Sequence, residues 1–199
     1  MALSVPLSDD VLDHLFYKAR SLVDWQDKPV SLETLKTLYD LVKMGPTSAN
    51  SCPLRILFLT TEAAKQRLLP HLHEGNVHQT KTAPVVALLA NDMDFPQHFP
   101  ALFPVAQAWF QGNAPLIAET AMRNASMQGG YFIMAARALG LDCGPISGFD
   151  AEGVNRDFFS ESPYTSWKIN FLCNIGYGDA RTLKPRLPRL PFETACLVV

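Results

Sequence analysis

The sequence predicts an α+β (mixed α/β) fold, in which a central mixed sheet is flanked by helices. Segments with apolar residues at helical spacing alternate with nearly continuous apolar runs that are typical of buried strands, and the chain has no internal repeat. At the end of the chain, prolines at positions 185, 188 and 191 exclude regular structure, and an apolar terminus follows them. We expect one domain over residues 1–199 that ends in an extended arm.

The first half of the chain predicts three helices and two strands. Apolar residues at helical spacing from Val11 to Leu22 predict a first helix, which Ser8 and Asp9 can cap. A second helix begins at Ser31 and ends before Gly45-Pro46, since proline lacks the amide hydrogen. Residues 54–60 and 84–90 predict two central strands, with a weaker helix over 61–72 between them.

The second half predicts an irregular connection followed by a long helix. Residues 92–115 form a loop or short helices near a ligand, and their aromatic residues either pack against a partner chain or cover a pocket: Phe95, Phe99, Phe103, Trp109 and Phe110. The long helix spans 116–139 and ends at Gly140, and its Gly129-Gly130 pair predicts close packing with a second helix. A helix capped by Asp150 and a strand over 167–175 follow.

Composition excludes several classes of function. The chain has 199 residues with a net charge of -2, so no global positive field attracts nucleic acid or an acidic membrane. No apolar run approaches the roughly 20 residues of a membrane span, and no targeting segment is evident, so we expect a cytoplasmic protein with a small polar ligand. The four cysteines lack a C-x-x-C pair, which favours buried reduced thiols: Cys52, Cys143, Cys173 and Cys196.

Three polar clusters are suited to a phosphorylated, planar heterocycle. The first is Arg20-Ser21, joined by the tail residues Lys184, Arg186 and Arg189. The second is the 45–53 loop, whose hydroxyls, amide and prolines can meet the edge of a ring. The third is the 140–149 segment, whose glycines leave backbone amides bare for a flat ring. A solvated charged face and a generic turn are the alternative interpretations of the first two.

Other catalytic arrangements fit poorly. His71, His73 and His78 stand near Glu74, but histidines two positions apart do not share a helix face, which favours surface histidines over a metal site. No G-x-S-x-G indicates a serine hydrolase, and no G-x-G-x-x-G follows a strand to cradle a dinucleotide. The 140–149 segment has no evident general acid beside it.

In combination and order, these clusters resemble the FMN-dependent nitroreductase family over nearly the whole chain. The resemblance implies a homodimer with FMN at its interface. It implies that Arg20 and Ser21 hold the FMN phosphate together with Lys184, Arg186 and Arg189, although Ala19 and Val23 stand where relatives often have basic residues. It also implies that the loop from Pro46 reaches the flavin of the partner subunit, through the residues Pro46, Thr47, Ser48 and Asn50.

The same resemblance places the flavin ring. It implies that Asn76 bonds the ring, with Gln79 where a lysine often stands. It also implies that a second run lies beside flavin N5, the atom that exchanges the hydride: Pro145, Ile146, Ser147 and Gly148. Within this run, Ser147 stands where many relatives have glutamate. No side chain is then required as a catalyst, no metal is implied, and NADH or NADPH delivers hydride in ping-pong fashion.

Four runs resemble more narrowly the malonic semialdehyde reductases of pyrimidine breakdown: residues 45–50, 144–150, 174–179 and 186–190. This resemblance implies reduction of the aldehyde to 3-hydroxypropionate. Two alternatives stay open. One is a broad NAD(P)H nitroreductase or quinone reductase with the same cofactor, and the other is a flavin-binding protein without turnover.

Overall fold

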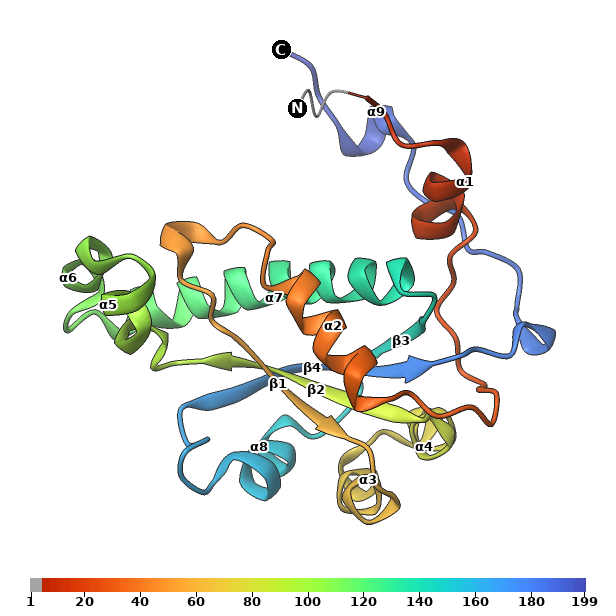
Figure 1. Ribbon diagram of the computed structural model, residues 1–199, viewed down its shortest axis with the longest axis horizontal. Coiled ribbons are helices and arrows are strands. Elements are labelled where there is room, and N and C mark those ends of the chain that lie inside the picture. The colour runs from red at the N-terminus through yellow and green to blue at the C-terminus, as the bar shows by residue number, and fades with distance from the viewer. Residues whose placement is uncertain (1–4) are drawn as a thin grey trace.

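The centre of the molecule is an antiparallel sheet. The computed structural model describes residues 5–199, except for the side chain of Thr182. Within them, four strands pair in the order β1-β2-β4-β3 (Figure 1): β1 (Leu54–Leu59), β2 (Val85–Asp92), β3 (Asp142–Ile146) and β4 (Trp167–Gly176). All three pairings are antiparallel, so the expected mixed sheet is wrong. Two successive helices between β1 and β2 return the chain to the end of the sheet where it left, which makes these strands antiparallel.

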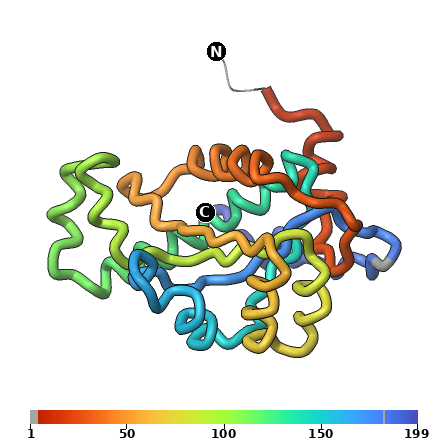
Figure 2. Tube along the Cα trace, turned by 60° about the horizontal axis from the view of Figure 1, so that its bottom comes forward, coloured from red at the N-terminus to blue at the C-terminus, as the bar shows by residue number. Residues whose placement is uncertain are grey.

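Helices cover both faces of the sheet (Figures 1 and 2). One face carries α2 (Leu32–Val42) and α7 (Ala114–Ala138), and the other carries α3 (Glu62–Leu68), α4 (Glu74–Thr82) and α8 (Ala151–Phe159). Among residues 5–199, four helices are single turns: α1 (Asp9–Leu12), α5 (Phe99–Leu102), α6 (Gln107–Phe110) and α9 (Phe192–Ala195). The capped starts of α2 and α8 are confirmed, because Ser31 accepts from the Thr34 amide and Asp150 from the Gly153 amide.

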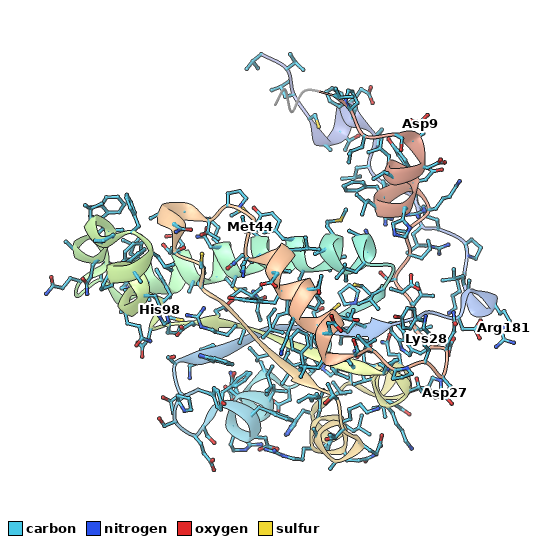
Figure 3. All side chains as sticks on the ribbon, in the orientation of Figure 1. Asp9, Asp27, Lys28, Met44, His98 and Arg181 are labelled. Carbon is cyan, nitrogen blue, oxygen red and sulfur yellow. The ribbon has the colours of Figure 1, made fainter. Side chains whose placement is uncertain are left out.

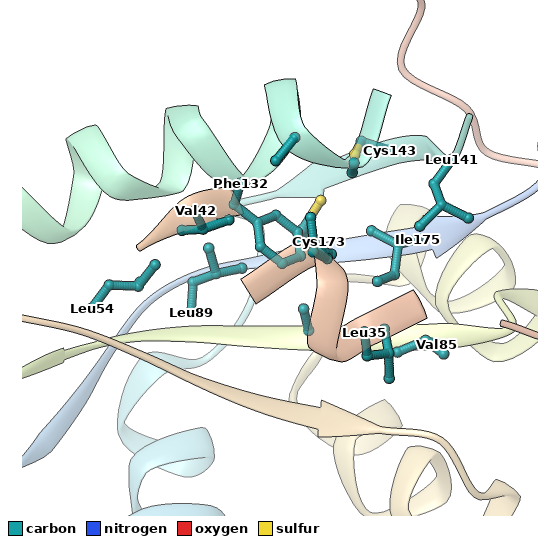
Figure 4. Close-up of a cluster of buried hydrophobic side chains, with 14 of the residues drawn as sticks. Leu35, Val42, Leu54, Val85, Leu89, Phe132, Leu141, Cys143, Cys173 and Ile175 are labelled. Carbon is teal, nitrogen blue, oxygen red and sulfur yellow. The ribbon is translucent and has the colours of Figure 1, made fainter. Parts of the chain in front are cut away.

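The apolar run of β2 belongs to two cores at once. Val85, Ala87 and Leu89 face α2 and α7, in the cluster that Figure 4 shows around Phe132. The alternate residues face α3 and α8 in a second cluster: Val86, Leu88 and Ala90. A strand covered on both faces has no polar side, which explains its continuous hydrophobicity. By contrast β1 is an edge strand with a half-buried interior, so its expected central place is wrong.

The strand β3 was not expected, because glycine and proline lower strand propensity. It is tolerated at the sheet edge, where Pro145 is not needed as a ladder donor. Gly144 is required there by close packing: a Cβ on it would lie 2.5 Å from the carbonyl oxygen of Leu22. The N-terminal segment therefore takes the space that a side chain would fill.

The first helix is shorter than expected. α1 continues as one π-helical turn, Asp13–Tyr17, and none of these residues is buried. The chain then runs extended, with bridges from Ser21 to Cys143 and from Trp25 to Gly178. Leu22 is buried by this extended course, not by a helix. The apolar pattern therefore predicted the burial of Leu22 correctly, but it predicted a helical conformation for this residue wrongly.

The 92–115 connection forms short helices, one of the two expected forms. Phe95, Phe99 and Phe110 are buried against one another, with ring centroids 5.2–5.8 Å apart. They form a satellite core over α7, and Phe110 also lines a cavity of about 620 Å³. Phe103 and Trp109 stay exposed as an edge-to-face pair.

Two helix expectations need correction. Gly129 of α7 meets the sheet and not a second helix, since a Cβ there would lie 2.6 Å from the Phe171 ring, whereas Gly130 faces open space. The helix expected over 61–72 is α3 followed by a 3₁₀ turn, Leu69–His71. α4 was missed because its residues have almost no apolar face.

The tail leaves the body of the molecule (Figure 1) and forms only the turn α9 after its last proline. Leu187, Leu190, Leu197 and Val198 are all more than 70% exposed. Cys143 and Cys173 are buried free thiols as expected, whereas Cys52 is half-buried and Cys196 is exposed. No helix formed by residues 5–199 is long and apolar enough to cross a membrane.

Candidate functional site

The predicted basic cluster forms where the tail crosses the N-terminal segment. A guanidinium nitrogen of Arg20 donates to the Lys184 carbonyl at 2.5 Å, and Arg186 donates to the carbonyls of Tyr17 and Ala19 at 2.8 and 2.6 Å. Residues far apart in the sequence are thereby brought together. Arg189 is not, since it donates to the Leu187 and Pro188 carbonyls of its own segment.

The cations at this junction lack acidic partners. Among the described ion pairs, none uses Arg20, Lys184 or Arg186, whereas nearby Arg181 pairs with Asp179 at 2.5 Å. Arg181 lowers the pKa of the Asp179 carboxyl to about 2 through hydrogen bonds. An arginine carries five N–H donors, and the contacts above leave several of them free. A cavity of about 260 Å³ beside Arg20 completes an arrangement suited to an anion.

A second group lies where α4 faces the segment after β3. The side-chain amide nitrogen of Asn76 donates to the Gly148 carbonyl at 2.9 Å, and the side-chain oxygen of Asn76 accepts from the side-chain amide of Gln79 at 2.8 Å. The Trp25 indole donates to the Gln79 carbonyl at 3.0 Å. The asparagine segment and the 145–148 run, separate in sequence, are thus one cluster in space. Each amide keeps one N–H for a further acceptor.

Two glycines of the third cluster are closely approached on the side where a Cβ would lie. The open side of Gly144 is filled by the Leu22 carbonyl, and that of Gly148 by the Asn76 amide nitrogen, 2.7 Å from where a Cβ would sit. Along the 145–148 run, Pro145 and Ser147 are exposed while Ile146 is buried. The exposed residues therefore form the outer surface that a ligand can reach.

These contacts form one continuous surface, which we call the β3 strip: residues 20–25, Asn76, Gln79 and 144–148. Leu22 touches Gly144, Trp25 reaches Gln79, and Asn76 reaches Gly148. Arg20 lies at one end, where Lys184 and Arg186 of the tail adjoin it, and the amide groups of Asn76 and Gln79 lie at the other. By the rise of an extended chain, Cys143 at the basic end and Gly148 at the amide end are about 15 Å apart.

The 45–53 loop is held elsewhere, over the middle of α7. Tyr131 donates its hydroxyl to the Pro46 carbonyl at 3.0 Å, and the Ser48 amide donates to the Asn124 side chain at 2.7 Å. The Thr47 hydroxyl accepts from the Cys52 amide at 3.1 Å. Three residues of the loop have positive φ, namely Ala49, Asn50 and Cys52, at 52°, 51° and 42°. The loop is therefore tightly shaped by its own chain.

One chain does not bring this loop to the β3 strip. Arg137, near the basic end, bonds the Leu15 carbonyl, and the helical rise from Asn124 to Arg137 is about 20 Å. Figure 3 shows Met44, next to the loop, well away from Lys28 and Arg181. No hydrogen bond or ion pair among residues 5–199 joins the loop to the strip. The second predicted cluster thus stands apart from the other two.

A cavity of about 740 Å³ lies on the loop side, lined by residues of the 45–53 loop and of β1. Its wall includes Arg55, which forms an ion pair with the buried Asp92 at 2.6 Å. Ser166 donates to the same carboxylate at 2.8 Å.

His73 is exposed, as expected of a surface histidine, but its place beside the 140–149 segment was not expected. In the structure, His71 bonds Asp157 at 2.6 Å and lowers the pKa of that carboxyl. His73 lies instead against Gly148, with ring Nδ1 3.0 Å from where a Cβ on that glycine would sit. No local signal in the sequence indicated this place, because the helix α4 that follows His73 was itself not expected.

Comparison with known proteins identifies relatives along almost the whole length. The model of the nitroreductase family matches residues 18–177. A Ralstonia nicotianae protein, whose name pairs NADH dehydrogenase with NAD(P)H nitroreductase, is 50% identical over 97% of this chain and 98% of its own.

Two solved structures share the fold. One is a protein described as a nitroreductase from Bacillus subtilis, with a TM-score of 0.84, 20% identity, and coverage of 94% of this chain and 98% of that one. The other is described as a nitroreductase in complex with FMN from Exiguobacterium sibiricum, with a TM-score of 0.83, 19% identity, and coverage of 98% and 100%.

Proposed function

This chain belongs to the nitroreductase family, and we propose that it is an FMN-dependent enzyme that passes hydride from NADH or NADPH to a small oxidised substrate. The observation that supports this most is the β3 strip. It has unpaired cations at one end and amide donors and acceptors at the other, about 15 Å apart along an extended chain. An elongated ligand with a phosphate at one end and a planar heterocycle at the other matches both ends.

At the basic end, Arg20, Lys184 and Arg186 would hold the phosphate, with the exposed Ser21 hydroxyl as a further donor. The donor chemistry fits, because guanidinium groups without carboxylate partners are suited to a phosphate dianion. We give Arg189 a lesser part, since it bonds its own segment. The contact between Arg20 and the Lys184 carbonyl would keep the two halves of this site together.

At the amide end, Asn76 and Gln79 would bond the edge of the ring while the 145–148 run lies beside its reactive centre. When bound, the FMN supplies the hydride chemistry, accepting from the nicotinamide and donating to the substrate. The protein has no dinucleotide-binding glycine motif, so the nicotinamide and the substrate would use the same exposed face in turn. Ping-pong kinetics follow, and parallel initial-rate plots test them against a ternary complex.

We infer that the active form is a homodimer. In one chain the 45–53 loop is shaped and rigid but lies away from the strip, and a second copy could present its loop there. In one chain the apolar tail is exposed, and the outer edge of β1 has no neighbouring strand. The tail of one chain can cover the β1 edge of the other. The tail would therefore wrap the partner subunit, with FMN between the chains.

For the substrate, we propose malonic semialdehyde, which would be reduced to 3-hydroxypropionate. The support is the resemblance of the runs 45–50, 144–150, 174–179 and 186–190 to reductases of that aldehyde. A broad nitroreductase or quinone reductase is the second candidate, and the name of the Ralstonia relative favours it. A flavin-binding protein without turnover is the third.

One set of anaerobic measurements separates these candidates. The purified protein should be yellow or take up FMN, and NADPH or NADH should bleach it. Re-oxidation by malonic semialdehyde supports the aldehyde reductase. Re-oxidation only by nitroaromatics or quinones supports the broad reductase, and bound FMN that neither nicotinamide reduces supports the non-catalytic protein. Protein that takes up no FMN would overturn the whole proposal.

A further inference from the structure

The His73 imidazole lies at the amide end of the β3 strip without a recorded partner. Within residues 5–199, the ring of every other histidine has one: His14 the Arg137 carbonyl, His71 Asp157, His78 Asp24 at 3.4 Å and His98 Asp92 at 3.8 Å. No described hydrogen bond or ion pair uses either ring nitrogen of His73. Among these histidines, His73 alone has no described partner on either ring nitrogen.

The backbone fixes His73 at this place. Its amide donates to the Gly148 carbonyl at 3.1 Å, and its carbonyl accepts from the Asn76 amide at 2.8 Å as the first turn of α4 begins. The His73 ring and the Asn76 side chain then occupy the same side of Gly148, where a Cβ would lie 3.0 Å from the first and 2.7 Å from the second. Glycine at 148 permits this approach. The ring is also exposed, so solvent and substrate both reach it.

We propose that His73 is the proton donor for reduction of a carbonyl substrate at this site, an inference that rests on the proposed function. Hydride from the reduced cofactor forms the new bond to the carbonyl carbon, and the π electron pair of the carbonyl moves to oxygen. The N–H bond of the His73 imidazolium breaks, its proton forms the hydroxyl, and the bonding pair stays on nitrogen. The neutral ring then regains a proton from water. The two electrons come from NAD(P)H, so the balance is complete.

Neighbouring groups do not fit this role. The nearby acids are Glu74 on α4 and, on the α8 side, Asp150 and Asp157. An ionised carboxylate accepts hydrogen bonds and has no proton to donate, and Asp157 is already paired with His71. Ser147 is exposed at the 145–148 run, but a hydroxyl is a poor acid at neutral pH. Histidine side chains change charge between about pH 5 and 8, so they can give and regain a proton under physiological conditions.

The main test compares His73→Gln with His71→Gln in stopped flow. Glutamine keeps a hydrogen-bond donor but cannot release a proton. A positioned general acid typically contributes 10²–10⁴-fold, so we expect His73→Gln to slow re-oxidation by malonic semialdehyde about 100-fold. Reduction by NADPH and re-oxidation by ferricyanide, which takes electrons without a proton, should change less than threefold. His71→Gln, two residues away, should leave all three rates within twofold.

A second measurement does not depend on turnover. Addition of FMN should shift the imidazole resonances that His73→Gln removes from the NMR spectrum, and FMN affinity should be equal in the wild type, His73→Gln and His73→Ala. Unshifted resonances, or re-oxidation by the aldehyde within twofold of wild type in His73→Gln, would overturn the proton-donor role. If the wild type takes up FMN and is reduced but the aldehyde does not re-oxidise it, the proposed substrate fails and the role fails with it.

Discussion

The β3 strip and the 45–53 loop differ in how much of a site one chain can build. Both resemble parts of the same cofactor site in sequence. The strip assembles from three separate segments through backbone and amide contacts, whereas the loop is held by Tyr131 and Asn124 on the middle of α7. If both belong to the proposed FMN site, one chain forms only one half of that site beside a detached second half. Two copies would unite them.

The largest expected effect comes from the tail. Deletion of residues 192–199 should convert the proposed dimer into monomers, because it removes exposed apolar residues of the tail. With no partner loop at the strip, FMN affinity should fall by about 100-fold, or roughly 2.7 kcal/mol. Light scattering on a sizing column and FMN fluorescence titration measure the two effects. Cys196→Ser in the full chain should change neither, which excludes a disulfide-linked dimer, and a deletion variant that stays dimeric would refute the exchange of tails.

The second prediction concerns the basic end of the strip, where a smaller effect is expected. Arg20→Ala removes an unpaired guanidinium and the anchor on the Lys184 carbonyl. A hydrogen bond to a charged group contributes about 1.5–3 kcal/mol, so FMN affinity should fall about 10- to 100-fold. Affinity for riboflavin, which lacks the phosphate, should change much less. Arg181→Ala is the matched control, since Arg181 is already paired with Asp179; equal losses in the two variants would contradict a specific phosphate site.

A third change tests how the strip is packed. In Gly144→Ala the new Cβ would meet the Leu22 carbonyl at 2.5 Å, so the 20–25 segment must move away. We expect a loss of about 1–3 kcal/mol in the free energy of unfolding, measured with urea, together with weaker FMN binding. Gly130→Ala faces open space in mid-helix and should instead stabilise by about 0.5–1 kcal/mol. An unchanged Gly144→Ala protein would show that the segment is not clamped.

The smallest effect concerns pH. The folded-state pKa of Asp179 is about 2, below its ordinary value of 3.8, because Arg181 stabilises the charged form. The stabilisation is therefore complete above about pH 4 and is lost as the pH falls toward 2. Asp179→Asn should flatten the decline of urea stability over that interval by a small amount, since the Arg181 side chain is exposed to solvent. An unaltered slope would mean that the pair contributes nothing measurable.

Much of this architecture was predictable because it depends on local pattern. The ends of α2 and α8 follow from Ser31, Gly45-Pro46 and Asp150, whose capping and helix-ending chemistry acts within a few residues. The strand β2 follows from its apolar run, since a strand between two helical layers has no polar face. The residues of the three polar clusters were likewise identifiable by type and order.

What the tertiary structure alone decided is which of these residues meet. β3 exists because an edge position tolerates Pro145 and because the Leu22 carbonyl needs the space at Gly144, and neither fact is local. His73 carries no signal until α4 packs it against Gly148. The sequence by itself determined the caps, the buried strand and the chemistry of the clusters. Long-range packing determined that two clusters form the β3 strip while the third lies apart, because contacts between distant segments depend on the shape of the whole chain.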